Sequence, residues 1–155
     1  MDRFYIITNS DKDSNLAITG KITEYLKAHG RSCEVQQAER KREGAYHYTD
    51  PSKIPDDTQC IIVLGGDGTL LQAARDVVHK EIPLLGINLG HLGFLAEVDQ
   101  TSLYSSLDQL MADDYEVEER MMLEGRVYRG KELIGDDIAL NDIVIGRDGH
   151  LRVVR

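Results

Sequence analysis

A glycine-rich turn with a carboxylate at its centre is the stretch of this sequence best suited to chemistry. Residues 65–69 read Gly-Gly-Asp-Gly-Thr and follow a short, β-branched apolar run at residues 60–64. That run predicts a buried parallel strand, and the apolar spacing after the turn predicts a helix with Thr69 as its N-cap. Backbone N–H groups and the positive end of the helix dipole then point at one place, which favours the binding of phosphate.

Asp67 distinguishes this turn from a simple phosphate-binding loop. A carboxylate repels a phosphate unless a divalent cation lies between them or the carboxylate takes a proton from a nucleophile. Both are roles in phosphoryl transfer. The alternative is a tight turn in which Asp67 caps the helix. The succession of strand, loop and helix favours the first interpretation over the second.

A second glycine-containing stretch follows at residues 86–95, after a strand predicted at residues 83–87. Its glycines are separated by apolar residues, which is unusual for a loop in contact with water. It forms either a second wall of a ligand cleft at the carboxyl ends of neighbouring strands, or a loop tucked under the sheet in which Phe94 and Leu95 plug the core.

Asn141 and Asp142 interrupt a strand-like apolar run at residues 138–145. One interpretation is a bulge or the end of a strand. The other is a polar pair that grips hydroxyl groups, because an amide and a carboxylate together match the diol of a ribose.

The elements that must position these residues suggest an α/β fold. A strand at residues 4–8, a helix at 16–26 and a strand at 32–36 form a β-α-β opening, which predicts a parallel sheet with right-handed crossovers. We expect residues 1–114 to form a Rossmann-like open parallel sheet with helices on both faces. Its first turn lacks the G-x-G-x-x-G fingerprint of dinucleotide-binding folds. Residues 115–155, with a hairpin at 129–130, are expected to be the opening strands of a truncated β-rich domain.

The composition excludes several classes of partner. The chain has 155 residues and a net charge of −9, which argues against binding nucleic acid or anionic membranes because both need a basic surface. The two cysteines are expected to be buried, inert thiols, and no residues have the spacing of a zinc site. The sequence contains no signal core and no apolar run of transmembrane length, so we expect a cytoplasmic protein.

Three stretches, in this order, resemble the signatures of the NAD kinase family. They are residues 65–69 (Gly-Gly-Asp-Gly-Thr), 86–95 (Gly-Ile-Asn-Leu-Gly-His-Leu-Gly-Phe-Leu) and 140–145 (Leu-Asn-Asp-Ile-Val-Ile). The first is shared with diacylglycerol and sphingosine kinases, and loosely with phosphofructokinases. The second is far more specific, and the resemblance runs from the first strand to the last residue.

The resemblance implies transfer of a phosphoryl group from ATP, or from polyphosphate in some members, to the 2′-hydroxyl of the adenosine ribose of NAD. The product is NADP. It also implies a divalent metal, usually magnesium, and a homo-oligomer. In such enzymes the residue matching Asp67 is the proton acceptor. The NAD contacts that the resemblance implies are Asp67, Gly68, Phe94, Asn141, Asp142 and Arg152; it identifies no metal ligand.

Family members are much longer than 155 residues. We therefore expect this chain to be a fragment that folds at least partly and is inactive or very weak alone. Two other functions stay open at this point. One is a lipid or sphingoid-base kinase with the same glycine loop, and the other is a nucleotide-binding module without catalytic activity.

Overall fold

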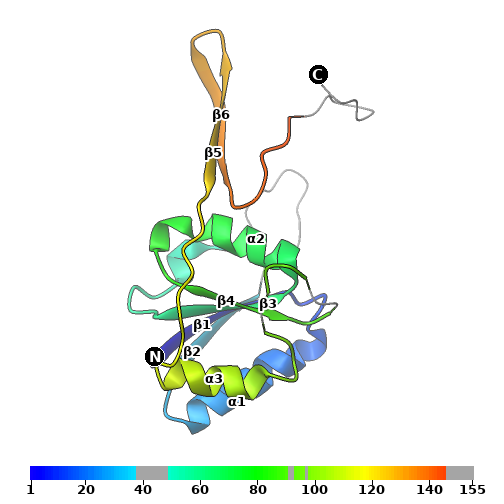
Figure 1. Cartoon of the computed structure of the whole chain (residues 1–155), viewed down its shortest axis with the longest axis vertical. Coiled ribbons are helices and arrows are strands. Elements are labelled where there is room, and N and C mark those ends of the chain that lie inside the picture. The colour runs from blue at the N-terminus through cyan, green and yellow to red at the C-terminus, as the bar shows by residue number, and fades with distance from the viewer. Residues whose placement is uncertain (38–48, 91–92, 97, 146–155) are drawn as a thin grey trace. The chain divides into compact units, whose positions relative to one another are not determined.

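The computed structural model describes residues 1–37, 49–90, 93–96 and 98–145 (Figure 1). The chain forms two compact units, Met1–Glu118 and Glu119–Arg155. Across the described ranges, no helix combines the length and the apolar character needed to cross a bilayer.

A four-stranded parallel sheet forms the centre of the first unit. Its strands are β1 (Arg3–Thr8), β2 (Ser32–Gln37), β3 (Cys60–Gly65) and β4 (Leu84–Asn88), in the order β2-β1-β3-β4. The two central strands are the most apolar, and every residue of β3 is buried, whereas β2 at the edge is largely exposed. The fold class predicted from the sequence is therefore confirmed.

Helices cover both faces of this sheet (Figure 1). The helices are α1 (Ala17–Ala28), α2 (Asp67–Asp76) and α3 (Leu103–Met111), with short 3-10 turns at Ser14–Leu16, Pro51–Lys53 and Val78–Lys80. Side chains alternate along each strand, so Ile6 of β1 packs with Ile22 of α1 and Leu107 of α3. Its neighbour Ile7 packs on the opposite face with Val77, next to the end of α2.

The parallel topology brings three loops to one edge of the sheet. The backbone N–H of Asn9, just after β1, donates to the carbonyl of Leu64 at 2.9 Å. The N–H of Leu89, just after β4, donates to the carbonyl of Gly65 at 2.8 Å. The loops that follow β1, β3 and β4 therefore meet at their carboxyl ends, which is where open α/β sheets bind ligands.

The second unit contains an antiparallel hairpin of β5 (Leu123–Arg129) and β6 (Glu132–Ala139). Gly130, with a φ of 66°, lies in its turn and confirms the predicted hairpin. The strand-like run at residues 138–145 is a strand only at its start, because β6 ends at Ala139; Asn141 and Asp142 therefore follow a strand end, which was one of the two interpretations. The last residue of β6 pairs with Leu123, the first residue of β5, so the segment that follows has no partner strand there.

Candidate active site

The glycine loop after β3 leads directly into α2. The helix begins at Asp67, and Gly66 is its N-cap in an extended conformation. The prediction of Thr69 as N-cap is therefore wrong. The side chain of Thr69 folds back over Gly65 instead, where a Cβ would overlap it. The Thr69 hydroxyl also accepts a hydrogen bond from the side-chain amide of Asn9 at 3.3 Å.

The carboxylate of Asp67 connects the first glycine motif to the second. Its Oδ2 atom accepts a hydrogen bond from the backbone N–H of Phe94 at 2.8 Å. Its Oδ1 atom accepts from the N–H groups of Leu95 at 3.2 Å and Ala96 at 3.4 Å. Asp67 thus binds the loop after β4 and does not cap its own helix. This bond joins residues that are 27 positions apart in the sequence, so the two motifs form one structure at the sheet edge.

These contacts determine the protonation state of Asp67. The N–H of Phe94 is the main cause that holds the pKa of this carboxyl below its usual range, against the opposing effect of partial burial. The N–H groups of Leu95 and Ala96 and the positive charge of Lys12 lower the pKa further. Asp67 is therefore an ionised hydrogen-bond acceptor at neutral pH.

The glycines of the second motif allow the two loops to approach each other. A Cβ on Gly93 would overlap the carboxylate of Asp67. A Cβ on Gly86 would lie 2.8 Å from Leu70 Cδ2 and 3.1 Å from Ala96 Cα. The glycine spacing visible in the sequence therefore reflects close contacts in three dimensions.

Phe94 is fully exposed, although its backbone is held by Asp67. The alternative in which Phe94 plugs the core is therefore wrong. Leu95 is half-buried and Ala96 is buried, so the chain turns inward only after Phe94. Gly68, at the start of α2, is exposed as well. Both residues are accessible to a ligand.

Sequence reasoning missed Lys12 and Asn9, which lie in the connection between β1 and α1. A Cβ on Gly66 would lie 2.6 Å from Lys12 Nζ, so the ammonium group rests over the glycine loop. The order of the predicted strands could have indicated these two residues. A polar loop that follows β1 must lie near the loop that follows β3, because the two strands pair in parallel.

The third motif lies in the second unit. Asn141 and Asp142 are exposed and follow the end of β6. Ile143 packs back on the hairpin, because a Cβ on Gly125 would lie 2.8 Å from its Cδ1. The NAD contacts predicted for Asn141 and Asp142 stay predictions. Arg152 lies outside the described residues.

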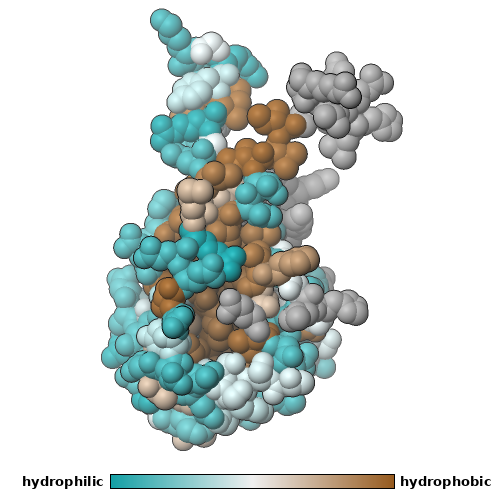
Figure 2. Space-filling view, in the orientation of Figure 1, coloured by the Kyte–Doolittle hydropathy of each residue, from teal (hydrophilic) through white to brown (hydrophobic). Residues whose placement is uncertain are grey.

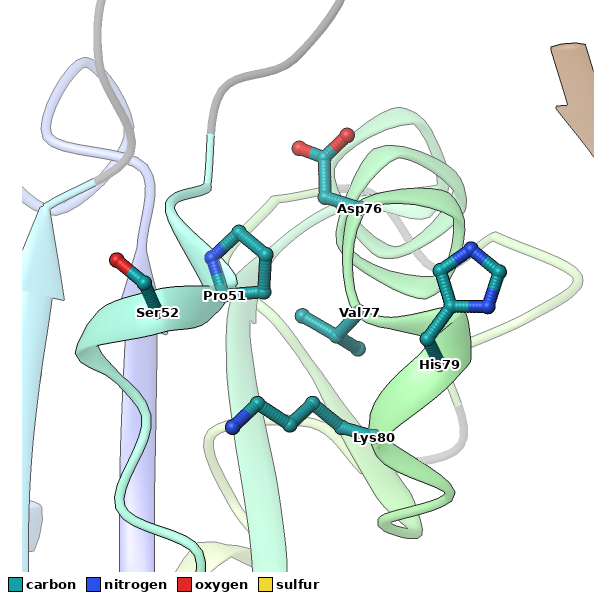
Figure 3. A pocket seen from close by; sticks show the side chains of 6 residues that line it. All are labelled: Pro51, Ser52, Asp76, Val77, His79 and Lys80. Atoms are coloured by element: carbon teal, nitrogen blue, oxygen red, sulfur yellow. The ribbon is translucent and has the colours of Figure 1, made fainter.

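A small surface pocket of about 210 Å³ lies elsewhere, around the carboxyl end of α2 (Figure 3). Its lining residues are Pro51, Ser52, Asp76, Val77, His79 and Lys80. Two of its charged groups, Asp76 and Lys80, already have protein partners. Asp76 accepts from the N–H of Thr49 at 2.9 Å, and Lys80 donates to the carbonyl of Ile54 at 3.2 Å and to Asp56 at 3.0 Å. These contacts hold the segment around residues 49–56 against the end of α2 and the 3-10 turn that follows it, which is a structural role.

No group of three or more His, Cys, Asp or Glu side chains is arranged to hold a metal ion in the part of the chain that the structure describes. Asp67 supplies one carboxylate, and both of its oxygens already accept backbone hydrogen bonds. This donor set does not form a resident metal site. It fits a magnesium ion that arrives bound to phosphate, since Mg²⁺ commonly keeps several waters and takes one or two protein carboxylates.

Comparison with known proteins places these motifs in a family. Residues 4–115 match the family model described as the ATP-NAD kinase N-terminal domain. Proteins named NAD kinase from Lachnospira eligens and from Lachnoclostridium phytofermentans are each 46% identical to the chain over 99% of its length. The matched part is 53% of the first protein and 54% of the second. The chain therefore spans about half the length of the curated relatives that it matches.

A crystal structure of yeast NADH kinase complexed with NADH has a similar fold. The TM-score is 0.54 at 16% sequence identity, and the match covers 91% of this chain and 47% of the yeast chain. This likeness supports the α/β architecture described above. Because the family model spans most of the sequence, the chain belongs to the ATP-NAD kinase family and carries its N-terminal domain.

Proposed function

We propose that this chain is the N-terminal part of an NAD kinase. The enzyme transfers a phosphoryl group from ATP or polyphosphate to the 2′-hydroxyl of the adenosine ribose of NAD and so forms NADP. The proposal rests on family membership, on relatives that carry the name NAD kinase, and on one structural observation. That observation is the Asp67 carboxylate, ionised and held against the second motif at the sheet edge.

Asp67 is proposed as the proton acceptor. Phosphoryl transfer proceeds through a loose transition state, so positioning and neutralisation of charge contribute more than strong base catalysis. A lowered pKa makes Asp67 a weaker base, and a weak base is sufficient here because the hydroxyl proton is taken late in the reaction. Its backbone partners fix its orientation, and an oxygen that accepts one hydrogen bond retains further acceptor capacity.

The remaining proposed contacts come from both units. Gly68 lies at the exposed start of α2, where a ligand can approach the backbone closely. Phe94 offers an exposed aromatic face as an apolar wall of the nucleotide pocket. Asn141, Asp142 and Arg152 are proposed to bind the ribose and its surroundings. All three belong to the proposed β-rich domain at residues 115–155, which follows the proposed α/β domain at residues 1–114.

Magnesium is proposed to enter with the phosphoryl donor. When bound there, it neutralises phosphate charge and orients the transferring group. The protein is also proposed to be cytoplasmic and homo-oligomeric, with NAD and the phosphate donor as its small-molecule substrates.

The test is NADP formation from NAD, ATP and magnesium. It uses the chain itself and an extended enzyme, in which the chain is followed by the second half of the Lachnospira eligens NAD kinase. We expect the extended enzyme to be active and its Asp67→Asn variant to lose at least about 100-fold in kcat, within the range of general acid–base effects. Glu24→Gln, an isosteric change at an exposed residue of α1, is the control.

Other outcomes would redirect the proposal. An extended enzyme that phosphorylates diacylglycerol or sphingosine but not NAD would identify a lipid kinase. Nucleotide binding without any turnover would identify a non-catalytic module. An Asp67→Asn variant with nearly full activity would leave the substrate in place and remove the role proposed for this aspartate.

A further inference from the structure

Lys12 has a backbone that is fixed at the sheet edge. Its N–H and that of Asp13 both donate to the carbonyl of Asn9 at 3.0 Å. Asn9 is in turn bound to the end of β3 through Leu64 and to the helix α2 through Thr69. Lys12 therefore follows an anchor, Asn9, that is hydrogen-bonded to both sides of the glycine loop.

The residue after Lys12 is a second anchor. Asp13 is buried, and its carboxylate accepts from the N–H groups of Ile18 and Thr19 at 2.9 Å and from the Thr19 hydroxyl. These bonds hold Asp13 against the first turn of α1. Lys12 is exposed, and these two anchors fix the backbone position from which its side chain extends.

The side chain of Lys12 extends over the glycine loop. Its Nζ would lie 2.6 Å from a Cβ on Gly66, the residue just before Asp67. Among the residues that the structure describes, no carboxylate lies within ion-pair distance of this ammonium group. Asp67, the acid of the loop, directs its oxygens to the backbone of Phe94, Leu95 and Ala96. The charge of Lys12 lowers the pKa of Asp67, but within the described part of the chain the ammonium group forms no ion pair, so its N–H donors can contact a ligand.

We propose that Lys12 is a phosphate-binding residue that contacts the transferring phosphoryl group of the donor at the glycine loop. This inference rests on the proposed function. The acceptor hydroxyl must lie beside Asp67 to lose its proton, and the transferred phosphoryl must lie in line with that hydroxyl. Lys12 Nζ lies over the residue adjacent to Asp67, and it is a compact positive charge with three donors.

Lys12 exchanges no proton and forms no covalent bond in the phosphoryl transfer. A bond forms between the acceptor oxygen and the terminal phosphorus, and the bond from that phosphorus to the bridging oxygen of the donor breaks. The electron pair leaves with the donor's remaining phosphates, and the hydroxyl proton passes to Asp67. Lys12 keeps its protons and stabilises the negative charge on the equatorial and leaving oxygens.

A binding experiment tests the site without turnover. Inorganic tripolyphosphate is titrated into the 155-residue chain and into the extended enzyme by calorimetry. We expect Lys12→Met to weaken its binding by about 10- to 100-fold, the range for losing a hydrogen bond to a charged group. Lys12→Arg should restore most of the affinity. Lys21→Met, which removes an exposed lysine of α1, is the matched control and should bind as the unmodified protein does.

Kinetics of the extended enzyme separate this inference from the proposed function. We expect Lys12→Met to lower kcat/KM for ATP while the KM for NAD stays within about two-fold, since the residue contacts the donor. The extended enzyme could bind tripolyphosphate through Lys12 and still make no NADP. That result would support the phosphate site and reject NAD as the acceptor. NADP formation and tripolyphosphate binding that both survive Lys12→Met would overturn the inference alone. Failure of the unmodified proteins in both assays would overturn both proposals.

Discussion

The Asp67 carboxylate accepts a hydrogen bond from the backbone N–H of Phe94 at 2.8 Å, and it thereby joins the loop after β3 to the loop after β4. One side chain thus performs two tasks. It holds the second glycine motif against the first, and it presents an ionised oxygen at the edge where three loops meet. Substitutions that break this contact should therefore lower stability and activity together. Substitutions of neighbouring side chains that leave the contact intact should alter only one of the two.

The acid stability of the chain should depend on Asp67. Its pKa is lowered in the folded state, chiefly by the N–H of Phe94, so the unfolded state binds its proton more readily. The stabilisation is therefore present above the unfolded pKa of about 3.9 and is lost as the pH falls through the lower folded value. Urea denaturation between pH 7 and pH 2.5 should show a smaller loss of stability for Asp67→Asn than for the unmodified chain. Glu24→Gln should follow the unmodified chain, and identical curves for all three proteins would contradict this account.

Gly93→Ala should damage both stability and activity. A Cβ at this position overlaps the Asp67 carboxylate, so the loop must move and the bond to Phe94 must lengthen. We expect a loss of about 1–3 kcal/mol in the free energy of unfolding, as for overpacked sites, together with at least a ten-fold loss of activity in the extended enzyme.

Gly20→Ala is the matched control for that change. Gly20 lies inside α1, and a Cβ added there would meet no other atom within 4 Å. The substitution should raise the stability by about 0.5–1 kcal/mol, because alanine is the better helix former. Equal effects of the two substitutions would show that the Asp67 contact does not constrain position 93.

Phe94→Ala should separate binding from stability. The side chain is fully exposed, so its loss should change the free energy of unfolding by no more than about 0.5 kcal/mol. The KM for NAD of the extended enzyme should rise, since the aromatic face is proposed to contact the nucleotide. Leu107→Ala is the contrasting variant. It removes a fully buried side chain and should cost about 2–5 kcal/mol in stability. An unchanged KM for NAD would argue against a nucleotide contact at Phe94.

The two cysteines should react slowly with thiol reagents in the native state. Burial raises the pKa of Cys60 to about 12 and that of Cys33 to about 11, so neither is a thiolate at neutral pH. Cys33 is half-buried on the edge strand β2 and should react first, whereas Cys60 in β3 should react only on unfolding. Mass spectrometry of the Cys33→Ala variant isolates the second rate. Rapid labelling of Cys60 in the folded protein would contradict its burial.

The hairpin of the second unit leaves apolar side chains open to solvent. Val127 of β5, Met121 before the hairpin and Val144 after it are each more than half exposed, and Figure 2 shows apolar residues beside polar ones in this part of the chain. A two-stranded ribbon is marginal by itself in water. This part of the chain therefore contributes far less to the free energy of unfolding than the sheet of the first unit does.

The sequence by itself determined the elements of the first unit. The apolar runs predicted the four strands, and the 3.6-residue spacing predicted α1 and α2, because both patterns record which side chains are removed from water. It also determined that Asp67 follows a buried strand, whereas the start of α2 at Asp67 came from the structure. Gly30 lies just after His29, the C-cap of α1, and its φ of 74° is the left-handed conformation in which glycine commonly ends a helix. Local chemistry was sufficient for these features.

Only the tertiary structure decided what the loop side chains contact. Thr69 turned out not to cap α2, Phe94 points outward, and the run after Ala139 is not a strand. Lys12 gained its place over Gly66 through the parallel pairing of β1 and β3. The physical reason is that periodicity reports burial along one segment, whereas a loop's hydrogen bonds depend on which distant loops the sheet brings to the same edge.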